Sequence, residues 1–388
     1  MNSLLFFAFI NSVGVITMWI MLAPYYSSVT GGLSAFGIII MVRQFSGILG
    51  NIFGGTIADH GSIKAKHFWC ELSVVLSAIL FATIFFIHEE IAIKALPLWV
   101  FFRFSIATIS SVIFYKLLTV YSSKKGESSI VQMMVSQGAV IIAPILAIIF
   151  PILWEKSFFI ALIFDIVTSI TYIAVLLNSP PVDEKMDSAK RKLQPLYIQM
   201  IQTATAMFSK KLYPWNVIQI LLLIGLGGFL VFVLNISHTQ KIIPADIFFP
   251  VMSVFYGFSL WANGYIAKKT KKPINLFTVS IIGLTLSGGI LLIDGLVFQL
   301  ISFFIYVEFL WLALHLSNKI LLDRAPKKNI GQINGSRALY LGLIFGITEL
   351  IYGQLFDINQ GITAMSYTRI VCGVGIILLL FTKNGKYS

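Results

Sequence analysis

Charged residues are scarce in this chain, and their scarcity argues against a water-soluble fold. Asp, Glu, Lys and Arg together make up only 11% of the 388 residues, whereas hydrophobic residues make up 57%. Soluble domains are about 25% charged and about 45–50% apolar. A soluble fold of this length could not bury so much apolar surface, so the composition predicts an integral membrane protein.

Cysteines and common catalytic motifs are also few or missing. Cys70 and Cys372 lie far apart within apolar runs, so neither a disulfide framework nor a metal site is indicated. The sequence has no Walker loop and no nucleotide-binding fingerprint, which argues against ATP-driven transport by this chain alone. It also has no zinc-binding HExxH motif, serine nucleophile elbow or paired-aspartate protease pattern. We therefore expect no cofactor and no enzyme activity.

Long apolar runs are abundant instead. A helix needs about 20 apolar residues to cross a membrane, and twelve runs approach or exceed that length. The first run has no basic segment before it and no small-residue cleavage site, so we interpret it as a spanning helix and not as a signal peptide. The sequence predicts an all-α membrane protein with helices near 4–23, 35–57, 69–88, 97–121, 130–150, 157–178, 214–236, 247–266, 274–293, 297–321, 331–352 and 363–382.

Basic residues between these runs predict the orientation of the chain. Nineteen lysines and arginines fall in one set of alternate loops and only three in the other. Cytoplasmic loops of membrane proteins carry the excess of basic residues, so the first set and both termini are predicted to be cytoplasmic. The richer set is Lys64, Lys66, Lys124, Lys125, Lys185, Lys190, Arg191, Lys192, Lys210, Lys211, Lys268, Lys269, Lys271, Lys272, Arg324, Lys327, Lys328, Lys383 and Lys386, and the poorer set is Lys94, Lys156 and Lys241.

The long segment 179–213 divides the chain into two halves, 1–178 and 214–388. After Pro195 its apolar residues recur at helical spacing, which is typical of an amphipathic helix on the inner membrane face, although a solvated linker remains the alternative. The halves also resemble each other. Gly264–Lys268 lies 209 positions after Gly55–Asp59 at the end of the corresponding run. The sequence therefore predicts a duplicated six-helix unit.

The loop after the run 35–57 carries a family resemblance. Twelve helices, cytoplasmic termini, a central loop and the Gly55-x-x-x-Asp59 spacing together resemble the major facilitator superfamily, with Lys64 in the last basic position of the family motif. His60, Ser62 and Ile63 depart from that motif. The resemblance covers nearly the whole chain and implies two pseudo-symmetric six-helix bundles.

The resemblance implies a gate at this loop. Asp59 is well placed to face the N-terminus of the helix near 331–352, where the helix dipole and Arg337 would hold the carboxylate while the cytoplasmic side is closed. The plainer alternative is that Asp59 caps a loop. His60 would make such a gate sensitive to pH if it titrates near ~6.5.

Other residues resemble branches of this superfamily. Arg103 occupies a place where the superfamily often has an arginine. Ala143-Pro144-Ile145-Leu146-Ala147 is similar to the bend of antiporters, and the run from Ser128 to Pro144 resembles the macrolide-efflux and enterobactin-exporter branch. Pro144 can equally be a helix kink without bearing on the direction of transport.

Ionisable residues inside the apolar runs are candidates for function, because a charge costs about 2.5–3.5 kcal/mol at the centre of a membrane. Buried carboxylates can couple transport to protons, and interior arginines can bind an anionic substrate. Alternatively, these acids and arginines pair with one another. The proton-coupling candidates are Asp165, Glu308 and Glu349, and the substrate-binding candidates are Arg43, Arg103 and Arg369.

These features together predict a secondary active transporter that works by alternating access. The favoured version is a monomer in the cell membrane that exports an amphipathic, drug-like compound in exchange for protons. The alternative transports an anionic metabolite, such as a carboxylate siderophore, on the interior arginines. A third class is a transporter-like receptor, for which no residue speaks directly.

Overall fold

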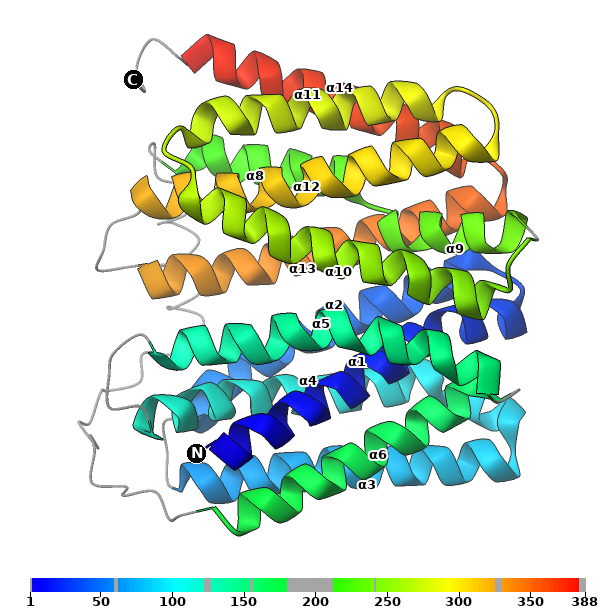
Figure 1. The fold of residues 1–388 in the computed structure, drawn as a ribbon, viewed down its shortest axis with the longest axis vertical. Helices are drawn as coiled ribbons and strands as arrows, with labels where there is room; N and C mark the ends of the chain where they lie inside the picture. The colour runs from blue at the N-terminus through cyan, green and yellow to red at the C-terminus, as the bar shows by residue number, and fades with distance from the viewer. Residues whose placement is uncertain are drawn as a thin grey trace. The chain divides into compact units, whose positions relative to one another are not determined.

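The computed structural model describes residues 2–58, 62–121, 127–153, 156–179, 212–240, 242–324 and 330–383. Every regular element within these ranges is a helix (Figure 1). The helices are α1 (Asn2–Thr30), α2 (Leu33–Ala58), α3 (Ile63–Ile87), α4 (Glu89–Tyr121), α5 (Glu127–Leu153), α6 (Ser157–Leu177), α8 (Tyr213–Leu226), α9 (Phe229–Thr239), α10 (Ala245–Lys269), α11 (Pro273–Leu291), α12 (Leu296–Arg324), α13 (Ile330–Asp357) and α14 (Gly361–Lys383).

Ten helical stretches of the described chain are long and apolar enough to cross a membrane. Helices suit this role because they pair every internal backbone N–H and C=O within one segment, as lipid requires. The chain is therefore a multi-pass membrane protein. Each of the twelve predicted runs falls on a helix, and 214–236 falls on the pair α8 and α9. For α5 only Gly138–Leu153 counts as a described apolar stretch, and α13 is not among the ten, so a total of twelve spans stays a prediction.

The chain divides into two compact units. Their limits do not follow the predicted halves in two places, because 32–37 belong with unit 2 and 241–257 with unit 1. The boundaries near 178 and 214 stay a prediction. Nearly all of the predicted amphipathic segment, residues 180–211, lies outside the described residues. Unit 1 is Met1–Gly31, Ile38–Ala189 and Lys241–Gly257, and unit 2 is Gly32–Gly37, Lys190–Gln240 and Phe258–Ser388.

In unit 1, α1 packs against α5 and α6, and α3 packs against α4 and α6. The small residues of α2 let its backbone approach α4. A Cβ on Gly50 would lie 2.5 Å from Thr108 Cβ and 2.6 Å from the carbonyl oxygen of Ser105. Such close approach through glycine is common where membrane helices meet. Gly50 therefore permits the close approach of α2 to α4 within this unit.

In unit 2, α11 packs against α12 and α14, and α14 packs against α8. The helix near 214–236 is broken. Gly227 ends α8, and Gly228 takes a left-handed conformation with φ +78° before α9 begins. A side chain on Gly228 would also collide with Tyr352, since its Cβ would lie 2.5 Å from Tyr352 Cβ. The break exposes the N–H groups of the first turn of α9, which need another partner inside the membrane.

Gly50 gives a direct test of the packing of α2. Overpacking a tight contact costs about 1–3 kcal/mol, so Gly50→Ala should lower the thermal unfolding midpoint of the detergent-purified protein. Gly47→Ala is the matched control on the same helix, because its Cβ would be 3.9 Å from the nearest side-chain atom, Thr108 Oγ1. Equal midpoints for the two variants would contradict the described packing.

Candidate functional site

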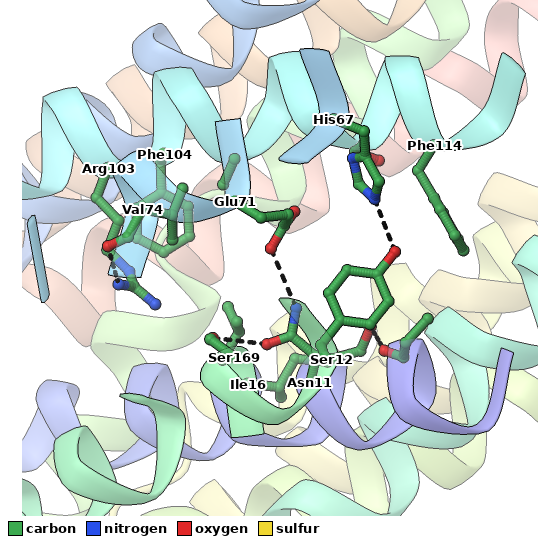
Figure 2. Close-up of a pocket in the computed structure, with 15 residues that line it drawn as sticks. Asn11, Ser12, Ile16, His67, Glu71, Val74, Arg103, Phe104, Phe114 and Ser169 are labelled. Atoms are coloured by element: carbon green, nitrogen blue, oxygen red, sulfur yellow. Dashed lines mark hydrogen bonds between the residues drawn. The ribbon is translucent and has the colours of Figure 1, made fainter. Parts of the chain in front are cut away.

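A cavity of about 260 Å³ lies inside unit 1, between α1, α3, α4 and α6 (Figure 2). Apolar residues form much of its wall, including Phe104 and Phe114. Polar side chains nevertheless come from all four helices. They are Asn11 and Ser12 of α1, His67 and Glu71 of α3, Arg103 and Ser111 of α4, and Ser169 and Tyr172 of α6.

A buried ion pair lies at one end of this group. Arg103 Nη2 donates to Asp165 Oδ2, and both side chains are almost completely buried, with 1% and 0% exposure. Arg103 Nη1 also donates to the carbonyl oxygen of Val74, at 3.4 Å, as Figure 2 shows. Asp165 Oδ1 has no hydrogen-bond partner among the described residues. The pair therefore retains one free acceptor, which can take a proton or a hydrogen-bond donor.

Glu71 is a second buried carboxylate in the same cluster. Its Oε1 accepts a hydrogen bond from Ser110 Oγ at 2.6 Å, and its Oε2 lies 3.4 Å from Asn11 Nδ2. Asn11 Oδ1 in turn accepts a hydrogen bond from Ser169 Oγ at 2.7 Å (Figure 2). Glu71 is thus held by neutral groups of α1 and α4, and no cation among the described residues contacts it directly.

His67 lies one helical turn before Glu71 on α3, and it is also buried. Its Nε2 lies 2.7 Å from Tyr172 Oη, and its Nδ1 lies 2.8 Å from Ser110 Oγ. Ser110 therefore contacts both the imidazole and the Glu71 carboxylate. These groups form an unbroken series of hydrogen bonds from α6, through α3 and α4, to the carboxylate.

The charges of the cluster do not balance by ion pairs alone. Two carboxylates, Glu71 and Asp165, and the guanidinium of Arg103 are buried together, and only Asp165 pairs directly with the cation. An unpaired ion in such a site costs several kcal/mol, because the interior has a low dielectric constant. One added proton would make this group of two carboxylates and one guanidinium electrically neutral.

In unit 2 a different carboxylate stabilises the helix break. Glu349 is fully buried, and its two oxygens accept hydrogen bonds from the backbone N–H groups of Leu230 and Val231, each at 3.2 Å. A negative charge is favourable at the N-terminus of a helix. Glu349 therefore satisfies the first turn of α9 where Gly227 and Gly228 interrupt the backbone series.

Arg369 occupies the position in the second half of the chain that corresponds to Asp165 in the first half. It is the ninth residue of α14, and Asp165 is the ninth residue of α6, 204 positions earlier. Its guanidinium lies over the ring of Tyr306, 3.7 Å from the centroid, and Nη1 donates to Ser302 Oγ at 3.1 Å. Tyr306 follows Arg103 by 203 positions. The matched positions thus hold an arginine–aspartate pair in unit 1 and a tyrosine–arginine pair in unit 2.

Comparison with solved structures identifies the fold. A POT family transporter in complex with 5-aminolevulinic acid matches 100% of this chain and 96% of its own, with a TM-score of 0.74 at 14% identity. The nucleoside transporter NupG matches 99% of this chain and 98% of its own, with a TM-score of 0.66 at 14% identity. A bacterial homologue of the iron transporter ferroportin in an inward-facing state matches 97% and 98%, with a TM-score of 0.69 at 13% identity. The chain has the fold of these transporters.

Sequence comparison adds no family. No protein-family model matches the sequence, and no curated protein sequence matches it significantly. The resemblance to the macrolide-efflux and enterobactin-exporter branch therefore stays a prediction.

Much of the predicted gate cannot be placed. Asp59 and His60 lie outside the described residues. Gly55 and Arg337 lie in helices, but neither the surroundings of Gly55 nor the side chain of Arg337 are described. Lys64 is described: its Nζ donates to the carbonyl oxygens of Leu177, at 3.2 Å, and Ser179. Lys64 therefore joins the beginning of α3 to the end of α6 within unit 1, and the gate itself stays a prediction.

The remaining predicted residues lie outside the cavity. The guanidinium carbon of Arg43 is 4.4 Å from the Trp19 ring centroid and 5.1 Å from that of Phe104. Glu308 Oε2 accepts a hydrogen bond from Asn263 Nδ2 at 2.8 Å in unit 2. Pro144 lies inside α5. Unlike Arg103 and Asp165, these residues are not brought together with another predicted one.

His67 and Glu71 are not among the residues predicted from the sequence. The apolar run begins near 69, which puts Glu71 at the level of the lipid headgroups, but α3 begins at Ile63. The available signal was their i, i+4 spacing, which puts an imidazole and a carboxylate on one face of a helix. Within the described chain no group of three or more His, Cys, Asp or Glu residues could hold a metal ion.

The ion pair can be tested through stability. Removing one partner of a buried pair costs about 3–5 kcal/mol, whereas replacing both by apolar residues is often neutral. Asp165→Leu should therefore lower the thermal unfolding midpoint, and adding Arg103→Met should restore much of the loss. Arg43→Met is the control for removing an interior arginine that has no carboxylate partner among the described residues. A double variant no more stable than Asp165→Leu would contradict a pair that matters energetically.

Proposed function

We propose that this chain is a secondary active transporter of the major facilitator type, in which the buried acids of unit 1 couple solute movement to protons. The transporter fold supports the general function. The observation that carries the coupling is the burial of Glu71 and Asp165 with Arg103 as the partner of only one of them. No nucleotide-binding motif is present to supply another energy source within this chain.

The coupling follows from the cost of burying charge. When Asp165 is ionised, its attraction to Arg103 holds α4 and α6 together across the cavity wall. When Asp165 takes a proton, that attraction is lost and the guanidinium must find another acceptor, for which Glu71 is in the same cluster. Protonation therefore changes the contacts among α3, α4 and α6, which is the kind of two-state change that alternating access requires.

For the solute we favour an amphipathic, drug-like organic compound that is exported in exchange for protons. The wall of the cavity supports this, because Phe104 and Phe114 and several aliphatic side chains surround a few polar groups. Binding sites for small organic molecules are mostly apolar with a few placed polar groups. We further propose that the transporter acts as a monomer in the cell membrane with both termini in the cytoplasm.

The alternative is an anionic metabolite such as a carboxylate siderophore. Arg103 and Arg369 support it less well than the sequence suggested, because Arg103 pairs with Asp165 and Arg369 is held by Tyr306 and Ser302. The surroundings of Arg43 support the anionic alternative. Its guanidinium contacts aromatic rings and has no carboxylate partner among the described residues.

Proton coupling is testable in proteoliposomes. With ethidium as the amphipathic probe and pyranine inside the vesicles, an imposed pH gradient should drive ethidium accumulation with opposite proton movement. Asp165→Asn should abolish accumulation while ethidium still exchanges across the membrane without a gradient. Wild-type exchange of ethidium that ignores the pH gradient would exclude the coupling. Asp294→Asn, at an exposed carboxylate in the loop between α11 and α12, serves as the control.

The anionic alternative depends on Arg43. With radiolabelled citrate as the carboxylate probe, Arg43→Gln should reduce uptake at least about tenfold if a charged contact of about 1.5–3 kcal/mol is lost. Arg43→Lys keeps the charge and is the matched control. Unchanged citrate transport by Arg43→Gln, or no citrate transport by the wild type, would count against this alternative.

A further inference from the structure

The hydrogen bonds around His67 connect Tyr172 to Glu71 without a break, and the proposed coupling through Asp165 does not use this connection. We propose that Tyr172, His67 and Ser110 form a proton relay that loads and unloads Glu71, so that Glu71 is a second proton-binding site of unit 1. The inference rests on the proposed function for its role in transport. The protonation of Glu71 and its route rest only on geometry.

The contacts are short and continuous. Tyr172 Oη to His67 Nε2 is 2.7 Å, His67 Nδ1 to Ser110 Oγ is 2.8 Å, and Ser110 Oγ to Glu71 Oε1 is 2.6 Å. Each donor–acceptor distance lies in the normal range for a hydrogen bond. Figure 2 shows the imidazole of His67 and the carboxylate of Glu71 on the same side of α3, facing α6 and α1.

The direction of the hydrogen bonds follows from counting protons. The single hydroxyl proton of Ser110 goes to the Glu71 carboxylate, so His67 Nδ1 must carry the proton that it donates to Ser110 Oγ. Neutral His67 then has an unprotonated Nε2, which accepts the hydroxyl proton of Tyr172. All three donors of the series therefore point towards an ionised Glu71.

Loading Glu71 reverses this order without leaving a charge on the relay. A hydronium ion gives a proton to Tyr172 Oη and becomes water, and the original hydroxyl proton of Tyr172 moves to His67 Nε2. The Nδ1 proton moves to Ser110 Oγ, and the Ser110 proton moves to Glu71 Oε1. One proton enters, one carboxylate is neutralised, and every donor now points away from Glu71. Unloading is the same sequence in reverse.

The position of the relay suits exchange with the cytoplasm. Tyr172 lies five residues before the end of α6, or about 7.5 Å along the axis, at the end predicted to be cytoplasmic. Asp165 is seven residues earlier than Tyr172, about 10 Å deeper. Among the described residues, the titratable and charged groups near Glu71 are Cys70 and His67 on α3, Arg103 on α4, and Asp165 and Tyr172 on α6. Glu71 therefore lies between the predicted entry point and the Arg103–Asp165 pair.

Time-resolved infrared spectroscopy of the purified protein after a flash-induced pH jump tests the relay without any transported solute. The carboxylic acid carbonyl band of Glu71 should appear in the wild type and be absent in Glu71→Gln. Ser110→Ala should slow its appearance by about 10²-fold, the lower end of what a positioned acid–base group contributes. Ser110→Thr keeps a hydroxyl and should restore the rate. Ser73→Ala removes an exposed hydroxyl of α3 that lies outside the cavity lining, and it should leave the rate unchanged.

Two results would overturn the relay. If the band is the same in Glu71→Gln, Glu71 takes no proton. If Ser110→Ala loads Glu71 at the wild-type rate, water in the cavity delivers the proton instead. Should Ser110→Ala fail to fold, Tyr172→Phe tests the same route, since it removes the entry hydroxyl alone. A normal relay in a protein whose ethidium exchange ignores pH would support proton binding by Glu71 and refute only the coupling proposed above.

Discussion

The cost of an unpaired charge inside the membrane constrains the rest of this structure. Three buried ionisable side chains of the described clusters are stabilised by defined partners. Asp165 pairs with Arg103, Glu349 accepts hydrogen bonds from the first N–H groups of α9, and Arg369 contacts Tyr306 and Ser302. Glu71 differs from these ions because its direct contacts are the side-chain hydroxyl of Ser110 and the side-chain amide of Asn11, among the described residues. A carboxylate in that setting is satisfied in either protonation state only if its neighbours can reverse their hydrogen bonds. Ser110 and His67 can do so, and a fixed backbone N–H could not.

The same constraint explains how far the sequence could be interpreted. The places of the apolar helices could be predicted, because a helix pairs the backbone of a long apolar segment within itself, as lipid requires. The total of twelve spans stays a prediction. The break between α8 and α9 could not, because it depends on Gly228 in a left-handed conformation and on Glu349, more than a hundred residues later, satisfying the freed N–H groups. A hydropathy average over the whole segment shows neither the break at Gly228 nor the contact with Glu349.

The site was only partly predictable for a related reason. Asp165, Arg103, Glu349 and Arg369 stand out because they are charged residues deep in apolar runs, but their partners depend on helix rotation, which the sequence does not fix. The possibility that acids and arginines pair proved correct for Arg103 and Asp165. Glu71 was hidden because α3 begins six residues earlier than the apolar run suggests, which moves the residue from the headgroup level into the helix. His67, just before the apolar run, and Glu71, in its first turn, therefore do not stand out as charged or polar residues deep in the membrane.

The two halves of the chain place residues of opposite charge, Asp165 and Arg369, at matched helix positions. Asp165 is the ninth residue of α6, and Arg369 is the ninth residue of α14. Asp165 contacts Arg103 of α4, and Arg369 contacts Tyr306 of α12. In unit 1 the acid can be neutralised by a proton, which weakens the contact. In unit 2 the arginine keeps its charge at all ordinary pH values, and the tyrosine ring attracts it without needing a charge of its own. The matched positions therefore hold a contact that a proton would weaken in unit 1 and a contact that it would not weaken in unit 2. Under the proposed coupling, a proton-driven change begins in unit 1 and leaves the corresponding contact of unit 2 intact.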